Sequence, residues 1–188
     1  MGHGRLSAAL LISLSVAAGA AGAGPAAAAT GGAAAPVHTG GTVVGQPPPP
    51  APAGRVASLA GGVATAPAGA PAPVRRIIRA GNKLQAKPYR YGGGHASFKD
   101  TAYDCSGTVS FALHGGRLLR APLDSTGLES WGKSGAGSWI TVYANAGHAY
   151  MVVAGLRLDT SGTSGRGPRW QQASRSSVGF VVRHPAGL

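Results

Sequence analysis

Apolar and polar positions follow a regular pattern only in the second half of the chain. From residue 74 to residue 84, apolar side chains recur at helical spacing (74, 77, 78 and, less strictly, 84), which predicts a short amphipathic helix with a basic outer face. A second apolar segment follows Asp104, a residue type that caps helices well. It predicts a helix from Cys105 to about His114, ended by two glycines at 115–116.

After a polar, glycine-rich middle, four segments are rich in β-branched and aromatic residues and predict strands: 138–143, 148–153, 155–159 and 178–183. The predicted helices precede the strands and do not alternate with them. This order favours an α+β fold, in which N-terminal helices pack on a small antiparallel sheet. We expect this domain to span residues 74–188.

The first 73 residues predict no packed core. Residues 1–29 combine a short positive start, an apolar stretch too short to span a bilayer, and small-residue cleavage patterns, which is typical of a secretory signal peptide. Residues 30–73 are rich in Ala, Gly and Pro and predict a disordered linker. We therefore expect a secreted or cell-wall-associated protein, extracytoplasmic and without a stable membrane span.

Charge narrows the range of partners. The chain has 17 Lys and Arg against 5 Asp and Glu, a formal net charge of +12. Such a charge favours anionic surroundings, namely cell-wall polymer, membrane headgroups or nucleic acid. Nucleic acid is disfavoured, because there is no dense basic cluster beyond Arg75-Arg76, no interleaved aromatic stripe, and an export signal. A simpler interpretation is that the charge keeps the domain soluble.

Cys105 is the only cysteine, although a structural cysteine in an oxidising compartment normally has a partner. It opens the second predicted helix, where the helix N-terminus stabilises a thiolate, so it is a candidate nucleophile. A thiol nucleophile needs a base, and His95 and His148 are the candidates. The other histidines are excluded by their positions. His3 lies in the signal peptide, His38 in the linker and His184 in the tail, and His114 lies too far from Cys105 along the same helix.

Asp159 favours His148 as the base. Antiparallel pairing of 148–153 with 155–159 would bring Asp159 beside His148, where a carboxylate can orient the imidazole and stabilise the imidazolium. Each residue taken alone also has an ordinary structural interpretation, as a strand-start histidine and a turn aspartate. One cysteine and scattered histidines give no metal-ligand spacing, so we expect no metal and no cofactor.

Residues 104–107, Asp-Cys-Ser-Gly, follow a Lys-Pro-Tyr-Arg-Tyr-Gly-Gly run at 87–93 and precede Gly147-His148. Together they resemble the NlpC-type cell-wall peptidases, papain-like cysteine endopeptidases of bacterial peptidoglycan, over roughly residues 75–165. The resemblance implies a catalytic set and a substrate-binding set. The catalytic residues would be Cys105, His148 and Asp159; the substrate-binding residues would be Tyr89, Asp104 and Ser106.

In that family the tyrosine lines the substrate site and helps the oxyanion, and the Asp and Ser bind the free amine of the substrate's L-Ala. The expected reaction is hydrolysis of the bond between D-γ-glutamate and the diamino acid of the peptidoglycan stem peptide. An aspartate in the third position is unusual for the family, and the expected Pro-Gly-Asp turn is replaced by Gly135-Ala136-Gly137. The tail after residue 165 matches no part of it.

Three alternatives stay open. The same fold could carry a thiol amidase or acyltransferase. The chain could be a non-catalytic, basic wall-binding protein with a vestigial site. Cys105 could instead be a redox cysteine or form an intermolecular disulfide.

Overall fold

The computed structural model describes residues 48–162 and 167–188. The predicted signal peptide, 1–29, and the first part of the predicted linker, 30–47, lie outside the described residues. Within those described ranges, no helix has the length and apolar character needed to cross a membrane.

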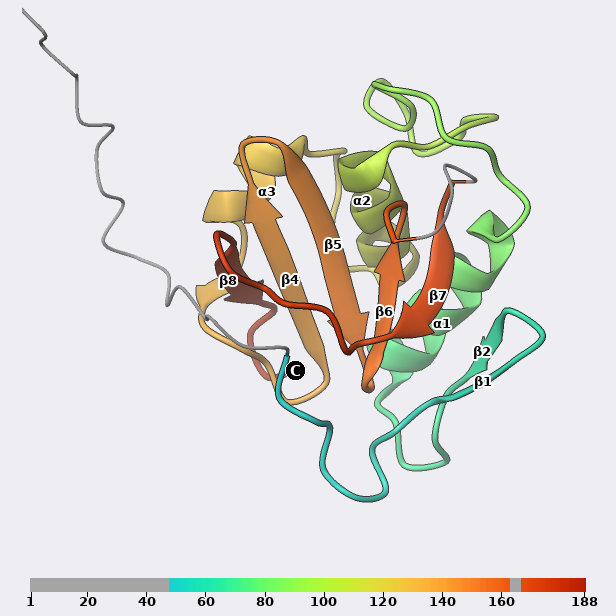
Figure 1. The fold of residues 1–188 in the computed structure, drawn as a ribbon, viewed down its shortest axis with the longest axis vertical. Coiled ribbons are helices and arrows are strands. Elements are labelled where there is room, and N and C mark those ends of the chain that lie inside the picture. The colour runs from blue at the N-terminus through green and yellow to red at the C-terminus, as the bar shows by residue number, and fades with distance from the viewer. Residues whose placement is uncertain (1–47, 163–166) are drawn as a thin grey trace, which may run out of the picture. The chain divides into compact units, whose positions relative to one another are not determined.

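A six-stranded antiparallel sheet organises the domain (Figure 1). Its order is β3-β8-β4-β5-β6-β7, so β8, the last strand in the sequence, lies between β3 and β4. The predicted α+β fold with an antiparallel sheet is confirmed. The strands are β3 (Lys133–Ser134), β4 (Ile140–Asn145), β5 (His148–Val153), β6 (Leu156–Asp159), β7 (Arg169–Gln172) and β8 (Val181–His184).

Three helices cover one face of this sheet: α1 (Ala72–Leu84), α2 (Cys105–Gly115) and α3 (Ser125–Ser130). α1 buries the apolar residues that its spacing predicted, Val74, Ile77, Ile78 and Leu84. α2 begins at Cys105 and packs against α1, β5 and β6. The helices share one core with alternate residues of β4, β5 and β6.

The opposite face of the sheet carries a second, smaller cluster formed by Tyr143, Tyr150, Val152 and Val182. Because side chains alternate along a strand, His148 shares this face with Tyr150, and Arg157 shares it with Asp159. Phe180 packs edge-on against Tyr150, with ring centroids 5.1 Å apart. The polar residues of β5 and β6 therefore gather on the face away from the helices.

The first strands correct the prediction of a linker. β1 (Ser58–Ala60) and β2 (Val63–Thr65) form an antiparallel hairpin within the segment predicted to be disordered. The side chain of Asn82 on α1 accepts a hydrogen bond from the Ala64 N–H at 3.0 Å and donates one to its carbonyl at 2.9 Å. Small side chains form the packed contact between this segment and the helix, since Ala57, Ala64 and Ala70 are buried there. The prediction of disorder as far as residue 73 is therefore wrong for this part.

The C-terminal residues also contribute more than the sequence indicated. β7 arises from the tail that matched no motif, and its Trp170 is buried against Gly81 of α1. The indole N–H donates to Asn82 Oδ1 at 2.9 Å. β4 and β8 begin two and three residues later than predicted, at 140 and 181, and α3 and β3 were not predicted.

The start of α2 is packed tightly against the glycine-rich loop before it. The Asp104 N–H donates to the Gly93 carbonyl at 3.1 Å, and a Cβ on Gly107 would overlap that carbonyl oxygen. Only glycine at 107 allows this approach, which fixes where Cys105 lies relative to the loop.

We predict that Gly107→Ala destabilises the domain by about 2 kcal/mol, because the added methyl group forces backbone apart. Gly69→Ala is the matched control, since a Cβ there meets nothing within 4 Å. Urea unfolding of both variants tests this. Equal midpoints would mean that the contact at Gly107 relaxes without cost.

Candidate active site

Cys105 is the first residue of α2 and is a half-buried free thiol. Asp104 caps the helix by accepting the Gly107 N–H at 2.8 Å. The first N–H groups of a helix have no intrahelical partner and form a positive end. The thiol therefore lies where a thiolate and a neighbouring oxyanion are both stabilised.

His148 lies at the start of β5, directly after a tight turn. The side-chain oxygen of Asn145 accepts the Gly147 N–H at 3.0 Å and the His148 N–H at 2.9 Å, which fixes the backbone there. The His148 ring contacts the edge of Phe180, with centroids 6.2 Å apart. Its Nε2 lies 2.9 Å from Asp159 Oδ1. Cys105 lies near enough to raise the pKa of the imidazole.

The three residues predicted as a catalytic set are thus brought together, with His148 between Cys105 and Asp159. Burial by itself would lower the pKa of His148. The hydrogen bonds to Asp159 and Cys105 outweigh burial and raise that pKa to about 9. At neutral pH the imidazole is therefore protonated beside the thiol.

Asp159 is 1% exposed and its carboxylate is fully occupied. Oδ1 accepts from His148 and from the Ser161 N–H, and Oδ2 accepts from the Ser161 hydroxyl at 2.9 Å and from two arginines. Burial alone would raise the pKa of Asp159, but these hydrogen bonds and the nearby positive charges hold it below its usual range. The carboxylate is therefore ionised throughout the physiological range.

The two arginines on Asp159 were missed by the sequence analysis. Nε and Nη2 of Arg157 both lie 2.7 Å from Asp159 Oδ2, and its guanidinium stacks on the Tyr150 ring at 3.3 Å. Nη2 of Arg175 lies 2.8 Å from the same oxygen. Arg157 could have been found from its position two residues before Asp159, on the same face of the strand. Arg175 follows β7 in the tail, and no local pattern links it to Asp159.

Tyr89 lies near the thiol on the other side. Burial raises its pKa, and the charges of Cys105 and Asp104 raise it further, which places the ring close to both residues. Tyr89 is 45% exposed, unusually high for a large ring, so its surface is accessible to a bound molecule. Its hydroxyl remains protonated at neutral pH and can donate a hydrogen bond.

His95, the alternative base, lies elsewhere. Its Nε2 is 2.9 Å from Ser106 Oγ and 2.9 Å from Asp104 Oδ2. Asp104 and Ser106, the predicted substrate-binding pair, are each 2% exposed beneath it. Of the two histidines considered as the base, His148 is therefore the one whose pKa Cys105 raises, whereas His95 contacts Asp104 and Ser106.

No protein-family model matches this chain, and no curated protein matches it. Among solved structures, the chain is similar to the peptidoglycan hydrolase RipB from Mycobacterium tuberculosis. The identity is 20% and the TM-score 0.48, over 60% of this chain and 64% of that one, so the chain spans just under two thirds of the RipB structure.

Two structures of the resuscitation promoting factor interacting protein RipA are also similar, one mutated at a histidine and one at a cysteine. Their identities are 16% and 18%, with TM-scores of 0.46 and 0.45. Each covers 69% of this chain, and the covered shares of the RipA chains are 71% and 72%.

We predict that the pair of His148 and Asp159 makes stability depend on pH. Because the pKa of His148 is raised from 6.5 to about 9, its stabilising contribution is complete below pH 6.5 and is lost as the pH rises to about 9. Urea unfolding from pH 6 to pH 9.5 should show a fall in the free energy of unfolding that is smaller in His148→Gln. Parallel curves for the two proteins would contradict it.

We predict that Arg175→Gln raises the pKa of His148 further, by up to about one unit, because it removes a positive charge that competes for Asp159. NMR titration of the imidazole measures the midpoint. Arg79→Gln, which changes an exposed arginine on α1, is the control and should leave the midpoint unchanged. An unchanged or lower midpoint in Arg175→Gln would show that this arginine does not tune His148.

Proposed function

We propose that the protein is a secreted cysteine peptidase that hydrolyses an amide bond in peptidoglycan stem peptides. The observation that supports this proposal is the position of His148, whose Nε2 lies 2.9 Å from Asp159 and whose pKa is raised by both Asp159 and Cys105. The three residues supply a nucleophile, a base and an orienting carboxylate in the order that acyl transfer needs. The bond that we assign is the one between D-γ-glutamate and the diamino acid, as the NlpC-type resemblance implies.

In the first step, the Cys105 sulfur attacks the substrate carbonyl carbon, with its proton held by His148. The protonated His148 then gives a proton to the leaving amine nitrogen as the carbon–nitrogen bond breaks, which leaves an acyl-enzyme. In the second step, His148 takes a proton from water, the hydroxide attacks the acyl carbon, and the thiol leaves as the carboxylic acid forms. Asp159 stays ionised and holds the ring in one orientation throughout.

The oxyanion that forms in each step needs hydrogen-bond donors. The Cys105 N–H at the start of α2 has the right position in the helix for this role. The Tyr89 hydroxyl, close to Cys105, is the second donor that we propose. The Cys105 N–H is held in place before substrate binds, because Gly107 and Gly93 allow the helix to pack closely against the loop.

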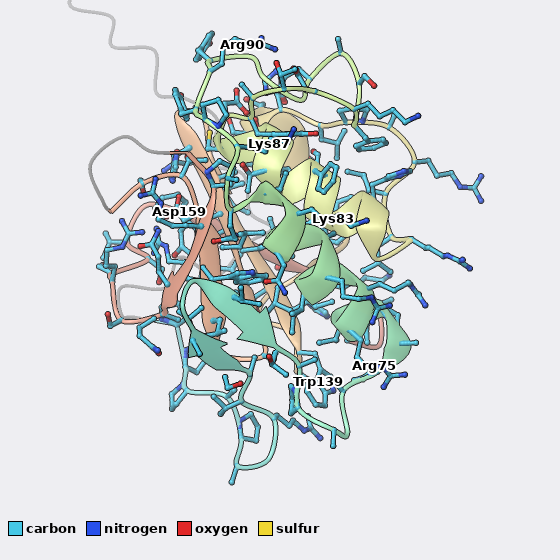
Figure 2. All side chains as sticks on the ribbon, turned by 90° about the vertical axis from the view of Figure 1, so that its right-hand side faces the viewer. Arg75, Lys83, Lys87, Arg90, Trp139 and Asp159 are labelled. Carbon is cyan, nitrogen blue, oxygen red and sulfur yellow. The ribbon has the colours of Figure 1, made fainter. Side chains whose placement is uncertain are left out.

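An anionic cell-wall polymer is the additional partner that we propose. Arg75, Arg79 and Lys83 are exposed at every fourth position of α1, and α1 contains no acidic residue. Figure 2 shows Arg75 and Lys83 along this helix, with Lys87 and Arg90 beyond its end. Such a row of positive charges favours contact with a negatively charged polymer and concentrates the enzyme on the wall.

We predict that Cys105→Ala lowers peptidoglycan hydrolysis by at least about a thousandfold, because it removes the group that forms the acyl-enzyme. Purified protein is incubated with intact peptidoglycan and the products are identified by mass spectrometry. His184→Asn is the control, since His184 contacts the Gly135 carbonyl and lies outside the site.

The same experiment separates the alternatives. Products cut between sugar and L-Ala would indicate an amidase, and transfer to an added amine would indicate an acyltransferase. Equal turnover in Cys105→Ala, together with a thiol that iodoacetamide does not alkylate at neutral pH, would leave a wall-binding protein with a vestigial site. A dimer on non-reducing gels would indicate a disulfide at Cys105.

A further inference from the structure

The crossover segment, residues 173–180, joins β7 to β8 and crosses the face of the sheet that carries His148 (Figure 1). β7 is at one edge of the sheet and β8 lies beyond β4, so the segment has to pass over β6, β5 and β4. Ala173 at its start and Phe180 at its end pack against the small apolar cluster of this face. The crossover segment therefore belongs to the surroundings of His148.

One amide side chain ties the end of the crossover segment to the turn that carries His148. Nδ2 of Asn145 donates to the Gly179 carbonyl at 3.1 Å, and Oδ1 of the same side chain accepts the His148 N–H at 2.9 Å. Phe180 follows Gly179 and packs nearly perpendicular to Tyr150, with an angle of 79° between the rings. The Phe180 ring is therefore fixed relative to the backbone of His148.

The imidazole of His148 lies against two of these rings. It forms a T-shaped contact with Phe180, with centroids 6.2 Å apart and an angle of 71° between the ring planes. Tyr150 lies at a similar distance, 6.4 Å, and its ring plane is tilted by 33°. Aromatic rings favour perpendicular contacts at such distances, so the contact with Phe180 restrains the tilt of the imidazole.

The hydrogen bond to Asp159 leaves this tilt weakly restrained. The bond holds Nε2 of His148, which lies close to the line of the Cβ–Cγ bond about which the ring turns. Rotation about that bond moves Nδ1, which lies farther from the line, through a longer arc than Nε2. Because the intrinsic minima of this torsion are broad in histidine, the orientation of the ring depends on what packs against it.

We infer that Phe180 is a positioning residue, which holds the imidazole of His148 at the angle where it serves both Asp159 and Cys105. This inference rests on the proposed function, in which His148 moves a proton at each step. Phe180 touches no reacting atom and acts through His148 alone. Cys105 lies near enough to raise the pKa of the imidazole, so a turn of the ring changes its relation to the thiol directly.

The test measures turnover and thiol reactivity in Phe180→Ala. On a soluble peptidoglycan fragment, we expect kcat to fall at least about tenfold and KM to stay within about twofold, because the base is misplaced while substrate binding is unchanged. The rate constant for alkylation of Cys105 by iodoacetamide at pH 7 should fall at least about threefold, since a thiolate beside an imidazolium is the reactive form. This second readout needs no substrate.

Two further variants separate positioning from stability. Phe180→Leu keeps an apolar side chain and should recover most of the urea midpoint lost in Phe180→Ala, but it lacks a flat ring, so kcat and the alkylation rate should stay low. Val178→Ala is the control, because Val178 is 60% exposed on the same segment. It should leave all three measurements unchanged.

The inference is wrong if Phe180→Ala matches the wild type in kcat and alkylation, or if both rates return in Phe180→Leu together with the midpoint. The proposed function fails separately, if the wild type cuts no peptidoglycan. A slower alkylation of Cys105 in both Phe180 variants would then still support the placement of His148 by Phe180.

Discussion

The carboxylate of Asp159 is the charge on which the site depends. It is almost completely buried, and an isolated ion there would be very costly. Its cost is offset because His148, Arg157, Arg175 and Ser161 all donate to it. These donors come from β5, from β6 and the turn after it, and from the segment after β7, so a single ion ties together half of the sheet. A buried ion of this kind adds little net stability, but it permits only one arrangement of the strands around it.

The cluster also sets how strongly His148 holds its proton. Asp159 attracts the proton on the imidazole through Oδ1, while the two arginines weaken that attraction by placing positive charge on its other oxygen, Oδ2. A single free carboxylate would stabilise the imidazolium more strongly. The partly neutralised carboxylate orients the ring while holding its proton less tightly.

The sequence predicted α1, α2 and the pairing of β5 with β6, because each depends on local periodicity or on a short turn. His148 and Asp159 could be paired from the sequence for the same reason, because they are only eleven residues apart. Arg175 and Trp170 could not be placed, since their contacts with Asp159 and Asn82 depend on the course of the whole tail. The hairpin of β1 and β2 was missed for another reason, as its core contacts are alanines, which carry little hydrophobic signal.

The position of β8 has a consequence for the order in which the site is assembled. β8 comes last in the sequence but forms an interior strand, between β3 and β4, and it directly follows Phe180, which packs on His148. Cys105 is synthesised well before these residues. The surroundings of His148 are therefore complete only when the final strand inserts into the sheet, so the last residues of the chain control when the site takes its final geometry.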